Sequence, residues 1–137
     1  MNPGRAAGFR QVRAAIGIRV HSGWAVAVAA GAGGGAAEFL GRACIPMADG
    51  ASPGGRQPYH AAEGMPFAAA ARLIEAASAA AQANAARAVM EFATAIARDC
   101  EIAGAVILAS SARALADLQS VLGSHAAIHA AEGELFR

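Results

Sequence analysis

The chain has 137 residues, 56% of them hydrophobic, and a formal net charge of +1. This length fits one domain with one sizeable core, which needs neither disulfides nor a structural metal to fold. The near-neutral charge argues against a broad electrostatic surface for duplex DNA or anionic lipid. No stretch of about 18 apolar residues is typical of a membrane span.

The N-terminal residues 1–13 are polar, rich in arginine and contain Pro3 and Gly4. We therefore expect a disordered tail, followed by a single domain over residues 14–137. The tail holds no apolar segment typical of a signal peptide, which favours a cytoplasmic protein.

Alternating apolar residues predict two successive strands, Ala15–Val20 and Trp24–Ala30. Residues 21–23 (His-Ser-Gly) have the composition of a tight turn, so the two strands should form a hairpin. Trp24 is expected in the core. A third strand is predicted over Ala37–Met47, and the three strands should form an antiparallel meander.

A loop over Ala48–Pro58 precedes a strongly helical, alanine-rich segment, Phe67–Asp99. This helix is either continuous or broken near Asn84. Its middle of small residues fits close packing against a sheet or against a partner helix, so a homodimer seam is one alternative. Ile102–Ala109 then has the continuous apolar character of a buried strand.

Ser110 and Ser111 are candidate caps for a helix that stops at Gly123, and Ser124–Ala131 is predicted to form a further short helix. An α/β domain usually adds another strand or helix after such elements. We therefore expect the domain to be minimal, or truncated at Arg137.

This order of elements predicts an α/β fold: a three-stranded antiparallel meander, a long alanine-rich helix, a buried strand and helices. The order resembles that of the ribonuclease H-like fold. Nucleases of that fold hold two metal ions with clustered carboxylates, one of them on the first strand. Arg19 or His21 occupies that place here, and the first acidic residue of the chain is Glu38. Nuclease chemistry is therefore not expected.

A five-residue block, His-Ala-Ala-Glu-Gly, occurs twice, as His60–Gly64 and as His129–Gly133. On a helix, a histidine and a glutamate three residues apart share one face. Such a carboxylate can fix the imidazole tautomer for base chemistry, or the pair can bind a metal. The alternative is a surface ion pair beside a helix end. The candidate catalytic residues are His60, Glu63, His129 and Glu132.

His125 and His129 are four residues apart, a spacing at which helical side chains bind metal from one side. With Glu132 they form a candidate site for a divalent metal. The glutamate that follows the first histidine in a zinc-protease helix is Ala126 here. The alternative is therefore a polar helix face with ordinary histidines.

We expect the polar side chains of these segments to gather at one edge of the sheet. The cluster comprises His21, His60, Glu63, His125, His129 and Glu132, flanked by Tyr59 and Arg19. The candidate ligand-binding residues are Arg19, His21, Ser22, Tyr59 and His125.

Three polar segments, Ile16–Trp24, Gln57–Gly64 and Ser124–His125 with Ile128–Phe136, resemble a family of small bacterial proteins without an established activity. The resemblance implies that these segments, and not the alanine-rich helix, are the signature of the family.

Three functional hypotheses follow. The preferred one is a non-nuclease binding or accessory domain whose His/Glu cluster recognises a small-molecule ligand, since no nucleophile and no complete acid set is visible. The second is a His/Glu-dependent, metal-assisted hydrolase of a small phosphate or acyl substrate. The third is a structural module that dimerises through its alanine-rich helix.

Overall fold

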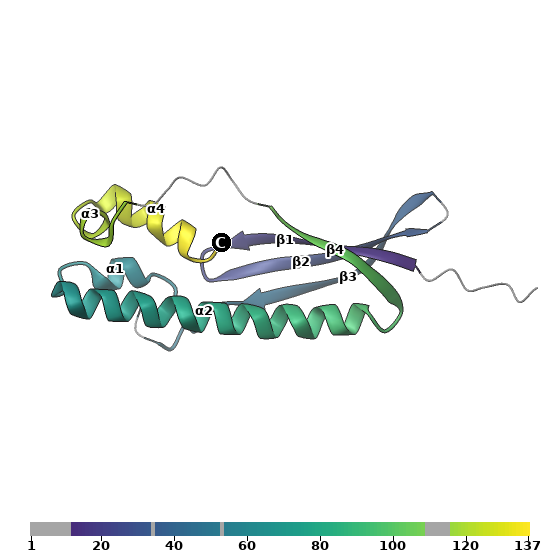
Figure 1. The fold of residues 1–137 in the computed structure, drawn as a ribbon, viewed down its shortest axis with the longest axis horizontal. Coiled ribbons are helices and arrows are strands. Elements are labelled where there is room, and N and C mark those ends of the chain that lie inside the picture. Colours follow the sequence, from purple (N-terminus) through teal and green to yellow (C-terminus); the bar gives the residue numbers. More distant parts are fainter. Residues whose placement is uncertain (1–11, 34, 53, 109–115) are drawn as a thin grey trace, which may run out of the picture.

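A computed structural model describes residues 12–33, 35–52, 54–108 and 116–137. Within these residues the chain forms one four-stranded mixed sheet and four helices, which confirms the predicted α/β class. Figure 1 shows the sheet at one end of an elongated molecule and three short helices at the other, with one long helix running beneath both parts.

The sheet begins with the predicted meander. β1 (Val12–His21), β2 (Trp24–Gly33) and β3 (Ala36–Pro46) pair antiparallel in succession. The turn between β1 and β2 is made by Gly23, whose φ of 82° is a left-handed conformation that glycine adopts without a steric penalty. β1 starts at Val12, inside the predicted tail; the rest of that tail lies outside the described residues.

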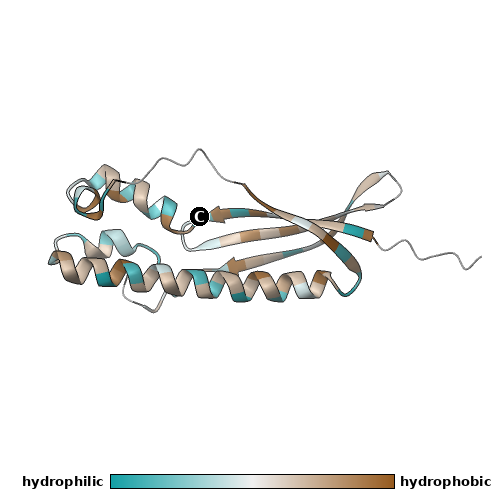
Figure 2. Cartoon of the chain, in the orientation of Figure 1, coloured by the Kyte–Doolittle hydropathy of each residue, from teal (hydrophilic) through white to brown (hydrophobic). Residues whose placement is uncertain are grey.

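The fourth strand, β4 (Cys100–Leu108), pairs parallel to β1, so the sheet order is β3-β2-β1-β4. The prediction that this strand is buried was wrong. Val106, Ile107 and Leu108 are 61%, 53% and 63% exposed, and Figure 2 colours this end of β4 as hydrophobic. β4 is an edge strand, and only its first residues reach the core, so an apolar sequence alone did not indicate burial.

The long helix α2 (Phe67–Ile96) has 30 residues and covers the inner face of the sheet. It is continuous through Asn84, where the alternative prediction placed a break. The side-chain amide of Asn84 donates to the carbonyl oxygen of Met47 at 3.0 Å. Small side chains on both surfaces, such as Ala27 and Ala81, let the helix and sheet approach closely.

Three short helices complete the described residues: α1 (Pro58–Ala62), α3 (Leu118–Leu122) and α4 (His125–Leu135). α1 had no counterpart among the predicted elements. The side chain of Asp117 caps α3, and the predicted caps Ser110 and Ser111 lie outside the described residues. Ser124 caps α4 by accepting a hydrogen bond from the backbone N–H of Ala127.

Within the described ranges, no helix combines the length and the hydropathy that crossing a lipid bilayer requires.

Candidate metal centre

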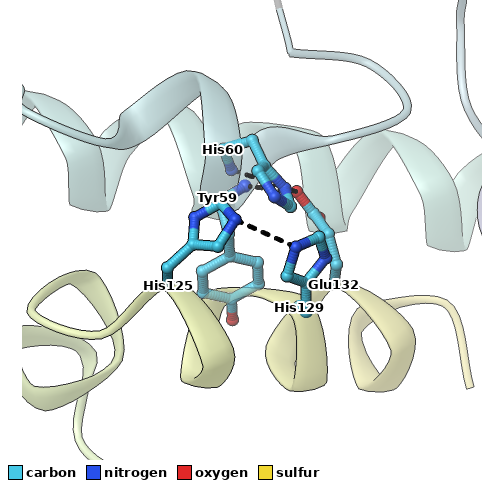
Figure 3. A network of polar contacts seen from close by, with 5 residues as sticks. All are labelled: Tyr59, His60, His125, His129 and Glu132. Carbon is cyan, nitrogen blue, oxygen red and sulfur yellow. Dashed lines mark hydrogen bonds and ion pairs between the residues drawn. The ribbon is translucent and has the colours of Figure 1, made fainter.

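Three histidines from two helices meet where α1 lies against α4. His60 comes from α1, and His125 and His129 come from α4 (Figure 3). One ligand nitrogen from each ring lies within 4.8 Å of the other two. The ring centroid of His129 is 4.6 Å from that of His60 and 4.6 Å from that of His125. Residues some 65 positions apart in the chain are thus brought into one cluster.

His125 and His129 occupy one side of α4 because they are separated by about one helical turn. Their Nε2 atoms are 3.1 Å apart, a hydrogen-bond distance at which one ring must donate and the other accept. Both side chains are exposed. The two Nε2 atoms therefore lie next to each other at the surface, and both become available to one ion when the donating ring gives up its Nε2 proton.

The carboxylate of Glu132 holds His60 from the opposite side. Glu132 Oε1 accepts from the backbone N–H groups of Tyr59 and His60, at 3.0 and 3.1 Å, and lies 3.1 Å from His60 Nδ1. The first-turn N–H groups of a helix lack partners within the helix, and the residue preceding α1, Gln57, provides no side-chain cap. Glu132 therefore caps α1 from a distant helix.

The same contact sets the tautomer of His60. A carboxylate can only accept, so His60 Nδ1 carries the proton and Nε2 is left as the basic nitrogen. This carboxylate–imidazole pair is the arrangement that orients metal-binding histidines. Glu132 is only 5% exposed, and within the described residues its Oε2 atom is buried without a hydrogen-bond partner.

The histidine of the first repeated block pairs with the glutamate of the second. The spacing predicted a histidine–glutamate pair within each block, but the contact joins His60 of the first block to Glu132 of the second. Glu63, the counterpart of Glu132, is exposed at the end of α1. The predicted metal set placed Glu132 beside His125 and His129, whereas the third group facing those two imidazoles is His60.

The other predicted site residues lie on the first hairpin. His21 stacks on Trp24, with centroids 4.2 Å apart, and Trp24 is 40% exposed rather than in the core as predicted. Ser22 is in the turn and Arg19 is exposed on β1. No interaction between described residues links this hairpin to the three histidines. The structure thus brings His60, His125, His129 and Glu132 together between α1 and α4, and not at an edge of the sheet as predicted. No hydrogen bond or ion pair between described residues adds the side chain of Glu63 or of His21 to this group.

Tyr59 lies between α1 and α4, packed against the apolar residues Val121, Ile128 and Ala131. Burial raises the pKa of its phenol above the ordinary value of 10.0, and the negative charge of Glu132 raises the pKa further. Both effects disfavour tyrosinate, so Tyr59 stays protonated and serves here as a packing residue.

This shift predicts a specific alkaline titration. Because Tyr59 is the chain's only tyrosine, the ultraviolet absorbance of tyrosinate reports on it alone. The raised pKa means that the folded state binds its proton more tightly, so this contribution to stability is present below about pH 10 and is lost as the pH rises above it. Glu132→Gln should lower the midpoint pH of the Tyr59 titration, because it removes the negative charge beside the phenol. A midpoint at the ordinary tyrosine value in the folded protein would contradict the placement of Tyr59.

Comparisons of this chain with protein-family models, curated proteins and solved structures find no match. Three imidazoles, one with its tautomer set by a carboxylate, can bind a divalent transition metal, act as proton acceptors, or do both.

Proposed function

We propose that this domain binds one divalent transition-metal ion of the zinc class through His60, His125 and His129. The observation that carries the proposal is the approach of three ligand nitrogens to within 4.8 Å of one another, at a point accessible to solvent. The preferred hypothesis from the sequence was a ligand-binding domain, and we propose a metal ion as its ligand.

The distances fit such an ion with little movement. Zinc–nitrogen bonds of about 2.0–2.1 Å in a tetrahedron place ligand nitrogens about 3.3 Å apart. His125 and His129 already have their Nε2 atoms 3.1 Å apart. The ligand nitrogen of His60 lies within 4.8 Å of this pair, and Nε2 is the nitrogen of His60 that Glu132 leaves without a hydrogen bond.

The electrostatics of Glu132 also favour a bound cation. A buried carboxylate with one oxygen unpartnered is costly unless a positive charge lies nearby. A divalent ion held by neutral imidazoles would supply that charge on the far side of His60. An all-imidazole ligand set favours zinc, copper, nickel or cobalt over magnesium and calcium, which prefer oxygen ligands.

A second candidate function is metal-assisted hydrolysis of a small phosphate or acyl substrate. It is favoured by the count of three protein ligands, since catalytic zinc sites keep a fourth position for water or substrate, whereas structural sites fill all four positions. An ion in such a site activates water as a nucleophile. Here the exposed sides of His125 and His129 leave that position accessible.

The test is calorimetric titration of the metal-free protein with zinc. We expect one equivalent of zinc to bind. Substitutions of residues that only contact a metal ligand weaken metal binding by about 10–100-fold, and His125→Ala, which removes a ligand itself, should weaken it by more. His21→Ala removes the one histidine outside the cluster and should bind zinc normally. Zinc binding that survives in both His60→Ala and His125→Ala would reject the site.

The ribonuclease H-like arrangement is part of the proposal. It is supported by the sheet order β3-β2-β1-β4, with β4 parallel to β1 and α2 between β3 and β4 in the chain. Because β1 carries Arg19 and His21 and no carboxylate, the two-metal nuclease chemistry of that fold is not proposed. The cytoplasmic location, the family resemblance and the dimer seam stay predictions.

A further inference from the structure

We propose that metal binding is coupled to the docking of α4 on α1. A bound ion would hold together two helices that are distant in the chain, and docking of the helices would in turn complete the metal site. This inference rests on the proposed metal site and adds a conformational role to it. The observation behind it is the division of the ligands: His60 belongs to α1, and His125 and His129 belong to α4.

Separation of the two helices would dismantle the site. His125 and His129 would stay together on α4 but lose His60, and two imidazoles on one exposed helix face form a much weaker site than three. A ligand that binds the docked form better than the separated form must shift the population toward the docked form.

The same interface carries the cap of α1. If α4 moves away, the N–H groups of Tyr59 and His60 and the ring Nδ1–H of His60 all lose their acceptor, Glu132. α1 has only five residues and no local side-chain cap, so its first turn depends on this contact. Metal binding, the tautomer of His60 and the order of α1 are therefore linked through one carboxylate.

The two ends of α4 are held differently. After its last turn, Phe136 is 5% exposed and packs in the core between sheet and α2. At its start, His125 is exposed and Ser124 caps only α4 itself. The apolar contact between the helices is limited to a few side chains, including Tyr59, Ile128 and Ala131. The metal would hold the end of α4 that lies farther from this core.

Amide hydrogen exchange measures this coupling directly, because the amides of Tyr59 and His60 bond to Glu132 and exchange when α4 separates. With free zinc at 100 times the Kd, opening that must release the metal becomes about 100-fold rarer. We therefore expect about 100-fold slower exchange at these two amides. Sheet amides, such as that of Ile16, should change little.

Two variants complete the experiment. His60→Gln removes a ligand without altering Glu132 or the backbone amide of residue 60, so zinc should no longer slow exchange there. His21→Ala should respond to zinc as the unsubstituted protein does. Calorimetry on the same samples separates the outcomes. No zinc binding would reject the metal site itself. Zinc binding without slower exchange at Tyr59 and His60 would overturn the coupling and leave the metal site standing.

Discussion

Replacing Glu132 by glutamine is expected to weaken zinc binding by about 10–100-fold, the usual effect of removing an outer-shell partner of a metal-binding histidine. Glu132 Oε1 accepts from three donors, and these bonds should weaken when the charged carboxylate oxygen is replaced by a neutral amide oxygen. The –NH₂ group of glutamine can also donate to Nδ1, which would place the proton of His60 on Nε2, the atom required for the metal.

The same substitution should lower the free energy of unfolding by about 1–3 kcal/mol, because N–H groups at the start of α1 lose a charged acceptor. Denaturant unfolding and zinc calorimetry measure the two effects separately. Glu63→Gln is the matched control, since Glu63 holds the same place in the other repeated block and is exposed. Zinc affinity equal to that of the unsubstituted protein would exclude Glu132 as a positioning residue.

Truncating Ile128 to alanine is expected to destabilise the protein by about 2–5 kcal/mol. Ile128 is fully buried, at 0% exposure, and packs with Val121 and Ala131 beneath Tyr59. The loss combines transfer of the side chain from water with the cavity left between α4 and α1. Because this contact helps place His129 on the same helix, zinc affinity should fall as well.

Ile107→Ala is the control for this truncation, because it removes the same atoms from a side chain that is 53% exposed on β4. The cost there should be about 1 kcal/mol or less, the span of strand propensities. Unfolding in denaturant, followed by circular dichroism, compares the two variants. Equal costs would mean that the contact between α4 and α1 contributes nothing to stability.

Local sequence patterns predicted most of the secondary structure. Alternation in the first three strands and the alanine content of the long helix are properties of neighbouring residues, and both predictions are confirmed. The burial of β4 was predicted incorrectly because exposure depends on which elements lie next to the strand. An apolar run such as residues 105–108 is compatible with a central strand and with an edge strand, so the sequence alone does not distinguish the two.

The site was predictable only in part, for a related reason. The repeated block indicated that His60, His129 and Glu132 belong together, and the helical spacing added His125. The spacing could not show that Glu132 would contact the histidine of the other block, since that contact depends on the packing of α4 against α1. His21 was included because of its residue type, but its stacking on Trp24 gives it a separate place.

The length of α2 has a mechanical consequence. At 1.5 Å per residue its 30 residues span about 45 Å. Its first part carries α1, through Ala70 and Ile74, and its second part lies on the strands, through Ala88 and Phe92. One continuous helix thus supports both the helical end of the molecule and the sheet. A displacement of its first turns would move α1, and with it His60, relative to α4, which Phe136 fixes to the sheet.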